Sequence, residues 1–333
     1  MKSIITTLLM FLTMSIYAQD NEEAMTEKPT LSFSGSVDAY YRSTAEAPAT
    51  SFANLNGFSL GMFNLVGTYE GEKAGIVADL VFGPRGEDAT FLSPTLRPGG
   101  SSNILNQLYA YLNVTDNITV TLGNFNTFLG YEVISPTANF NYSTSYMFSY
   151  GPFSHTGLKL DASFESGFSF MVGVFNPTDE TEFNLSDDYF FGTQLGYDFG
   201  QGSIYLNGLF GPDYTQVDLT GGIDIIDALF VGVNATTASD NLFSGVAGYV
   251  QYGMSDDFTL GIRAESFTDR GVGAFLPEGL EDESVFAVTL SGQYKIDNLT
   301  IIPEFRVDSS SDSDIFEDGS SLSSFLLAVT YGF

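Results

Sequence analysis

Apolar and polar residues alternate along most of this chain, and this alternation restricts its fold more than any other feature. Clear examples lie at 31–42, 157–164, 258–265 and 299–308. A period of two is that of a β-strand with one apolar and one polar face, because successive side chains on a strand point to opposite sides. No helical period competes with it after residue 18. The pattern therefore predicts an all-β protein without helices.

The alternating stretches predict about 16 strands, and because boundaries read from a pattern shift by a few residues, roughly 14 or 18 strands also fit. The strands are expected near 31–43, 57–70, 75–86, 103–114, 118–129, 154–165, 168–177, 189–200, 202–211, 215–226, 228–238, 243–254, 257–268, 284–296, 299–308 and 321–333.

The connections between these strands alternate in length. Short turns rich in Gly, Asp and Asn fall near 70–75, 115–117, 165–167, 200–202, 226–228, 255–257 and 296–298. Longer segments lie at 84–102, 130–153, 178–188, 269–283 and 309–320. A rim of short turns, a rim of long loops and an even number of strands are typical of outer-membrane barrels. We therefore expect a closed antiparallel transmembrane β-barrel with short periplasmic turns and longer extracellular loops.

Charges within the predicted strands fall only on the polar face, which a barrel would turn toward its lumen. The set comprises Asp38, Arg42, Asp79, Lys159, Asp161, Asp198, Asp218, Asp224, Arg263, Glu265, Lys295, Glu304, Arg306 and Asp308. A soluble sandwich would segregate its charges too. However, a sandwich must bury its apolar face, and this chain has no helix or linker to organise so large a core.

Aromatic residues end the apolar face beside the short turns, where a girdle at the membrane interface belongs. This predicted lipid-facing girdle is Phe164, Phe199, Tyr252, Tyr294, Tyr331 and Phe333. The final stretch, 325–333, is apolar to its end. Such an end suits a lipid-facing strand that pairs with the first strand and leaves no open edge.

The N-terminus predicts export. Lys2 precedes the apolar run 4–18, which ends at Ala18 before the polar sequence QDNEE. This is the pattern of a secretory signal peptide, and the run is too short for a typical membrane anchor. We expect a signal peptide at 1–18, a short periplasmic segment at 19–30 and the barrel at 31–333, located in the outer membrane of a Gram-negative cell.

Composition excludes several partners and cofactors. The 333 residues include no Cys, so no disulfide or Cys-ligated metal is possible. Asp and Glu number 41 against 11 Lys and Arg, a net charge of −30. Nucleic acid is therefore not an expected partner, because phosphate binding needs basic patches.

One segment carries a family resemblance. Its sequence, from Gly123 to Lys159, reads GNFNTFLGYEVISPTANFNYSTSYMFSYGPFSHTGLK. It resembles the central signature of the OmpL-like β-barrel porin family, in which a G-x-F-x-T-x-x-G-x-E stretch precedes G-P-F-x-H-T-G. The matching residues are Gly123, Phe125, Thr127, Gly130, Glu132, Gly151, Pro152, Phe153, His155, Thr156 and Gly157. The resemblance implies a passive or weakly selective porin. Tyr331 and Phe333 also resemble the C-terminal signal read by the barrel-assembly machinery.

Catalysis and metal binding have weak support. His155 is the single histidine, and Ser154 beside it would point to the opposite face of a strand. The acidic stretch 308–318 lacks the spacing of a calcium loop. We expect no catalytic residue, no metal site and no cofactor.

The segment 130–153 differs from the other long segments, because it is rich in Tyr and Phe and carries one charge, Glu132. A loop in solvent would not expose so much aromatic area. We therefore expect this segment to fold into the barrel and narrow the channel. The alternative is that it packs over the mouth of the barrel or against a partner subunit. The predicted pore-lining residues are Asp38, Arg42, Asp79, Glu132, His155, Lys159, Asp161, Arg263, Glu265, Lys295, Glu304 and Arg306.

The function predicted from these features is an outer-membrane porin for passive diffusion of small hydrophilic solutes. An excess of wall acids and the acidic loops favour weak cation selectivity, although the basic wall residues opposite Glu132 would oppose it with a transverse field. The alternatives are a substrate-specific channel and, less favoured, a barrel enzyme or an adhesin. The expected partners are membrane lipid, the assembly machinery and the solutes; the oligomeric state stays open.

Overall fold

The computed structural model describes residues 29–93, 98–239, 242–275, 283–310, 315–317 and 319–333. The predicted signal peptide and nearly all of the 19–30 segment lie outside these ranges. Within them the chain forms 16 strands, as expected. They are β1 (Thr30–Arg42), β2 (Gly57–Glu70), β3 (Ala74–Phe82), β4 (Leu105–Thr115), β5 (Ile118–Asn126), β6 (Ser154–Ser163), β7 (Phe168–Phe175), β8 (Phe190–Asp198), β9 (Gly202–Phe210), β10 (Thr215–Ile226), β11 (Leu229–Ala238), β12 (Phe243–Gly253), β13 (Phe258–Asp269), β14 (Glu283–Ile296), β15 (Leu299–Ser310) and β16 (Ser321–Gly332).

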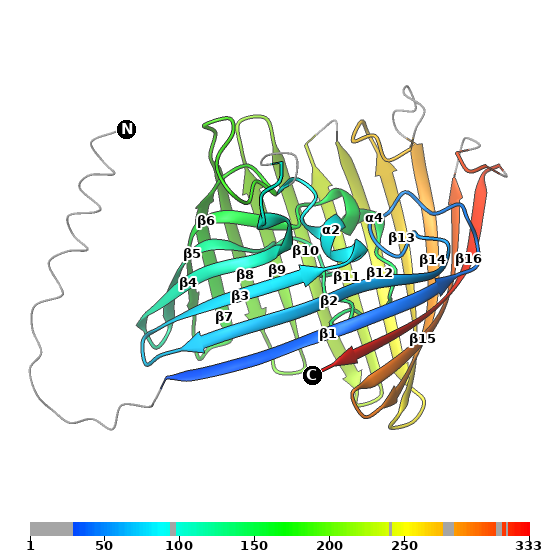
Figure 1. Ribbon diagram of the computed structural model, residues 1–333, viewed down its shortest axis with the longest axis horizontal. Helices are drawn as coiled ribbons and strands as arrows, with labels where there is room; N and C mark the ends of the chain where they lie inside the picture. Colours follow the sequence, from blue (N-terminus) through cyan, green and yellow to red (C-terminus); the bar gives the residue numbers. More distant parts are fainter. Residues whose placement is uncertain (1–28, 94–97, 240–241, 276–282, 311–314, 318) are drawn as a thin grey trace, which may run out of the picture.

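The strands close into one antiparallel barrel, which confirms the predicted fold (Figure 1). Each strand pairs with its neighbours in sequence, and β1 pairs with β16 from Ser36 opposite Gly332 to Arg42 opposite Leu326. Gly35 and Phe333 extend this seam by exchanging two backbone hydrogen bonds of 3.0 Å. Closure pairs the backbone groups that an open sheet would leave exposed at its edges, as a bilayer requires.

The outer surface of the barrel is apolar. Along β16 exposed and buried residues alternate, with Phe325, Leu327 and Val329 exposed and Leu326 and Ala328 buried. The six residues of the predicted girdle are all exposed, with exposed fractions from 42% to 52%. Exposed apolar side chains on the outside and buried polar ones on the inside are the arrangement of a barrel surrounded by lipid.

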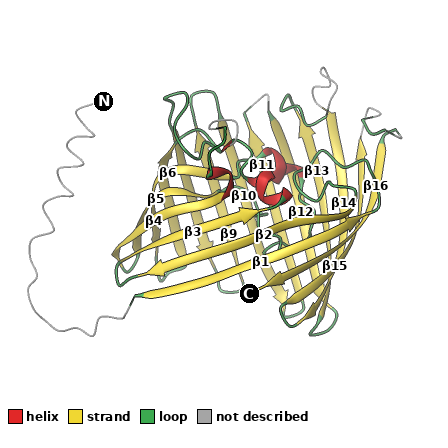
Figure 2. Cartoon of the chain, in the orientation of Figure 1, coloured by secondary structure: helices red, strands yellow, loops and turns green. Residues whose placement is uncertain are grey.

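Two short α-helices correct the expectation of a chain without helices (Figure 2). The helix α2 (Pro84–Ala89) ends β3 earlier than expected, because Gly83 has a φ of +95° and Pro84 is suited to a first helical turn. The helix α4 (Tyr146–Tyr150) is capped by the Ser145 side chain, which accepts the N–H of Phe148. A 3₁₀ turn, η1 (Ser102–Ile104), precedes β4. No helix in the described ranges is long and apolar enough to cross a membrane.

The connections follow the predicted alternation of length, with one addition. Turns of two to four residues join the strands at one rim, and most loops at the other rim are longer. The loop 43–56, which was not expected to enter the barrel, carries Phe52 into its interior, where Phe52 packs with Met62 and Val81. Like 130–153 it carries a single charge, Glu46, but with one aromatic residue, Phe52, it lacks the composition that marked 130–153.

Candidate functional site inside the barrel

The loop between β5 and β6, residues 127–153, runs through the interior of the barrel, and we call it the inner loop. A hydrogen bond from Thr127 N to Phe153 O (2.9 Å) joins its two ends. Gly130, with a φ of +84°, donates its N–H to the carboxylate of Asp218 on β10 (2.9 Å). The loop therefore leaves β5 and contacts a distant strand of the wall within four residues.

Two glutamates on the wall bind the backbone of the inner loop. Glu304 on β15 accepts the N–H groups of residues 142 and 143 (2.9 and 3.2 Å). Glu265 on β13 accepts those of residues 146 and 147 (2.9 and 2.8 Å), at the start of α4. Both carboxylates are buried, and a buried carboxylate is stable only when donors surround it. The loop backbone supplies those donors.

Arg263 on β13 connects the wall to the only charge of the inner loop. It forms an ion pair with Glu132 and donates a hydrogen bond to the carbonyl of Ser143 (2.8 Å). Glu132 also accepts the N–H of Ser145 (2.7 Å). The predicted transverse field across an open pore is therefore wrong for this pair, because the two charges are in direct contact.

The other basic residues of the predicted wall either have partners other than Glu132 or are exposed. Arg306 pairs with Asp308 (2.7 Å) and donates to the carbonyl of Thr144 (2.8 Å). Lys159 pairs with Asp161 (2.9 Å). Arg42 donates to the carbonyl of Glu46, and Lys295 is exposed near the short-turn rim. Among the described residues, none of these four is paired with Glu132.

Aromatic packing holds the inner loop on several sides. Tyr146 and Met147 pack against Phe243 and Phe267 of β12 and β13. On other parts of the wall, loop residues Phe148, Phe153, Tyr142 and Leu129 pack against Met62, Val81, Tyr40, Phe125, Phe175 and Leu209. The loop thus contacts the wall around much of its circumference, which confirms an inward position and not one above the mouth.

These contacts change the role of most predicted pore-lining residues. Nine of them are buried: Asp38, Arg42, Asp79, Glu132, His155, Arg263, Glu265, Glu304 and Arg306. Lys159 and Asp161 are half-buried, and Lys295 is exposed. The buried residues face the lumen, as the alternation requires, but they bind the loops or polar side chains of the wall, and Glu132 also lines a polar cavity. Asp38, for example, accepts the Met62 N–H (3.0 Å) and the Tyr142 hydroxyl.

His155 lies in an aromatic environment at the start of β6. Its Nε2 is 2.9 Å from the Thr127 hydroxyl, and its ring packs on Phe128 and Phe175 at centroid distances of 5.0 and 5.1 Å. It is fully buried, so it does not line an open channel. Within the described part of the chain, no group of three or more His, Asp or Glu residues is arranged for a metal ion.

Asp179, in the loop after β7, holds the end of the inner loop and was not identified from the sequence. Its carboxylate accepts the N–H groups of Phe153 (2.9 Å) and Ser154 (2.8 Å). Burial raises the pKa of Asp179 to about 6, although the two donors favour its charged form. The inner loop is therefore attached at a group that titrates near neutral pH.

Arg85 of α2 was also missed. It donates to the carbonyls of Ile134 (2.8 Å) and Tyr142 (3.3 Å), and its guanidinium lies 4.5 Å from the centre of the Phe52 ring. No local pattern marks Arg85, because its partners lie 49 and 57 residues away in the sequence.

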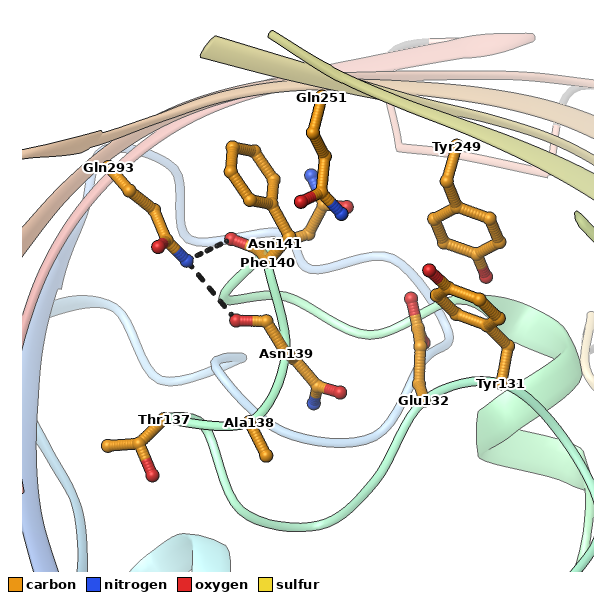
Figure 3. Close-up of a pocket in the computed structure, with 10 residues that line it drawn as sticks. All are labelled: Tyr131, Glu132, Thr137, Ala138, Asn139, Phe140, Asn141, Tyr249, Gln251 and Gln293. Atoms are coloured by element: carbon orange, nitrogen blue, oxygen red, sulfur yellow. Dashed lines mark hydrogen bonds between the residues drawn. The ribbon is translucent and has the colours of Figure 1, made fainter. Parts of the chain in front are cut away.

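Polar cavities lie along the inner loop. One of about 360 Å³, drawn in Figure 3, is bounded by the loop and by β12 and β14. It shares Tyr131 with a cavity of about 610 Å³ beside β8 to β11, and Thr137 and Gln293 with one of about 460 Å³ beside β14 to β16. The two larger cavities include residues of the short-turn rim, such as Gln201 and Asp297. The interior on this side of the loop is therefore hollow and polar.

Comparison with known proteins agrees with this architecture. The family model described as "Putative beta-barrel porin-2, OmpL-like" matches residues 30–333. No curated protein sequence matches the chain.

Solved structures share the fold at low sequence identity. A loop L8 deletion mutant of OmpT, an outer membrane protein of Vibrio cholerae, has a TM-score of 0.61 at 13% identity, covering 92% of this chain and 100% of that one. An anion-selective porin from Comamonas acidovorans has a TM-score of 0.61 at 11% identity with the same coverage. A mutant of the Rh. blastica porin has 0.53 at 14% identity, again with 92% and 100% covered.

Proposed function

The chain belongs to the OmpL-like family of β-barrel porins of the outer membrane, and we propose that small hydrophilic solutes diffuse through it past the inner loop. The observation that supports this most is the inner loop itself, which lies inside the barrel with polar cavities beside it. A barrel of this many strands is wide enough for an aqueous channel. The inner loop is then the element that sets which solutes pass.

We expect the channel to favour cations weakly. Glu132 and Asp308 pair with arginines, but the buried carboxylates of Asp38, Asp218 and Glu304 are bound by neutral donors, so the wall keeps a negative charge. Acids concentrate in the loops of the long-loop rim, notably in 179–188 and in 278–284 and 312–318, of which the last two lie mostly outside the described residues. A negative mouth raises the local cation concentration, an effect that salt screens over about 10 Å at 0.1 M.

Single-channel recording in a planar bilayer tests both parts of the proposal. The refolded protein should give discrete conductance steps. Under a tenfold potassium chloride gradient, the reversal potential should have the sign expected of a channel that passes potassium more readily than chloride. This preference should fade at molar salt. The absence of any conductance from correctly folded protein would contradict the channel. A preference for anions would contradict the selectivity alone.

Export and assembly complete the proposal. A signal peptide at 1–18 would direct the chain across the inner membrane, and the segment 19–30 would lead into the barrel. Tyr331 and Phe333, at the end of β16, would be read by the barrel-assembly machinery. Replacing both by Ala should lower the amount of heat-modifiable barrel recovered from the outer membrane.

A substrate-specific channel is the second candidate, because the cavity in Figure 3 is lined by ordered polar side chains. A barrel enzyme is less favoured: His155 contacts Thr127 and two Phe rings, which leaves it without a carboxylate to orient it as a base. An adhesin is likewise less favoured, since the longest loop lies inside the barrel.

A further inference from the structure

We propose that the cavity between the inner loop and strands β12 and β14 is a binding site for an uncharged polyhydroxylated solute of about monosaccharide size. The cavity is the one drawn in Figure 3. Its volume, about 360 Å³, is near the lower end of the range of roughly 300–1,000 Å³ that small-molecule sites occupy. The inference rests on the proposed channel and names the class of solute that the channel would hold.

Unpaired polar groups belong to the residues that line this cavity. The Tyr249 hydroxyl is buried and has no hydrogen-bond partner among the described residues. Gln251, two residues further along β12 on the same inward face, makes no side-chain hydrogen bond within the described ranges. Gln293 uses its amide N–H₂ on the carbonyls of Asn139 (3.3 Å) and Phe140 (2.9 Å), which leaves its oxygen free. These groups offer donors and acceptors that a ligand could satisfy.

The cavity presents no unbalanced charge. Glu132 is the one formally charged side chain of its lining, and both of its oxygens are occupied, one by Arg263 and the other by the N–H of Ser145. A charged solute would lose its hydration without gaining an opposite charge, which is costly. Hydroxyl groups, which both donate and accept, match neutral amides and phenols without this cost.

Aromatic rings supply the apolar part of the lining. Tyr131 and Tyr249 stack with their ring centroids 4.1 Å apart. Phe140 lies on the same cavity and fits against the wall at Gly261, where a Cβ would come within 2.2 Å of its ring. Tyr131 and Phe140 are half-buried, so each keeps ring surface open to the cavity, and such a surface suits the C–H groups of a sugar ring. Amides, phenols and aromatic faces without free charge together select a neutral sugar-like solute.

The cavity adjoins two larger cavities toward the short-turn rim. Its lining shares Tyr131 with the 610 Å³ cavity and Thr137 and Gln293 with the 460 Å³ cavity. A solute in either neighbouring cavity is therefore separated from the site by no more than these shared side chains. The site lies where a solute would wait before passing the loop.

Saturation-transfer NMR on the refolded full chain in micelles tests the inference. The probes are D-glucose, the anion D-glucuronate and the cation D-glucosamine, which share a six-membered sugar ring and differ in charge. Glucose should give the strongest transfer. Tyr249→Phe and Gln251→Ala should weaken glucose binding roughly two- to tenfold, the usual effect of losing one neutral hydrogen bond. Tyr252→Phe, the same change on the outer face of β12, should leave binding unchanged.

Equal transfer from all three probes, or transfer that neither inner variant reduces, would overturn the inference, provided that both variants keep their heat-modifiable barrel mobility. Channel activity is measured separately in bilayers. Conductance without glucose binding would overturn the site and leave the channel standing. Glucose binding without conductance would support the site and overturn the channel.

Discussion

At the scale of single residues, the wall carboxylates act as acceptors for the backbone of a loop. A carboxylate buried in a protein loses its hydration, and it is stable only if donors replace the lost water. Glu265 and Glu304 meet this requirement with two loop N–H groups each. The same bonds satisfy N–H groups that the loop has removed from solvent. Each glutamate therefore depends on the loop, and the loop on the glutamate.

Glu265→Gln and Glu304→Gln should each loosen the inner loop, because an amide keeps one acceptor oxygen and turns N–H₂ toward the other donor. We expect a loss of about 2 kcal/mol per site, or roughly thirtyfold faster exchange of the bound N–H groups. Hydrogen exchange measured by mass spectrometry on peptides covering 140–148 checks this. Glu165→Gln, in an exposed turn, is the control. Unchanged exchange in both inner variants would show that aromatic packing alone holds the loop.

At the scale of elements, the inner loop is held by its surroundings more than by its own secondary structure. Its regular part is α4, a helix of 5 residues that would not be stable alone. Strands β1, β10, β13 and β15 supply charged partners through Asp38, Asp218, Arg263, Glu265, Glu304 and Arg306. The loop therefore needs the closed barrel around it to have a defined shape.

Replacing residues 135–144 by two glycines should increase the single-channel conductance while the barrel still assembles. The change removes the bonds to Glu304 and Arg306 and the ring of Tyr142, so more of the lumen fills with water. The control deletes 185–188, which are exposed in the loop after β7. If the variant inserts and folds but keeps the conductance of the natural chain, the inner loop is not the constriction of the channel.

Asp179 should make the stability of the barrel depend on pH. Its pKa is raised from 3.8 to about 6 in the folded chain, so the folded state binds more protons than the unfolded state between these values. The contribution of this carboxyl group to the stability of the barrel is therefore largest below about pH 4 and is lost as the pH rises through about 6. The two-unit shift corresponds to about 3 kcal/mol. Asp179→Asn should remove this part of the pH dependence of urea unfolding, and identical profiles for both chains would contradict it.

At the scale of the whole molecule, the barrel is polar inside and apolar outside, the reverse of a soluble domain. Val288 on β14 points outward between Phe286 and Leu290, which are both exposed. Across the neighbouring strands it is paired with Ala264 and Val307. This position is in the middle of its strand, where the surrounding medium is hydrocarbon.

Val288→Arg should lower the free energy of unfolding by about 2–4 kcal/mol, the usual cost of a basic residue near the bilayer midplane. Ile296→Arg, at the outward-facing end of the same strand, should cost only about 0–1 kcal/mol because the interface is close. Urea unfolding from lipid vesicles measures both. Equal costs at the two positions would mean that the depth of β14 in the membrane is different.

The strands, their number and their two faces could be predicted from the sequence because alternation is a local property. Phe325, Leu326 and Leu327 point out, in and out whatever the rest of the chain does. The inward direction of Arg263, Glu265 and Glu304 could be predicted in the same way. The aromatic composition of 130–153 was enough to indicate that this loop avoids solvent.

The partners of those inward residues depended on the tertiary structure. Glu304 binds the loop at a sequence separation of 162 residues, and Arg263 meets Glu132 at a separation of 131. A pattern with a period of two specifies which side of the wall a charge is on, but not what fills the space in front of it. Only closure of the barrel brings the inner loop against β13 and β15. The sequence by itself determined a membrane barrel with charges inside, and the tertiary structure decided that the buried arginines and glutamates among them hold loops, because burial leaves them no water to face.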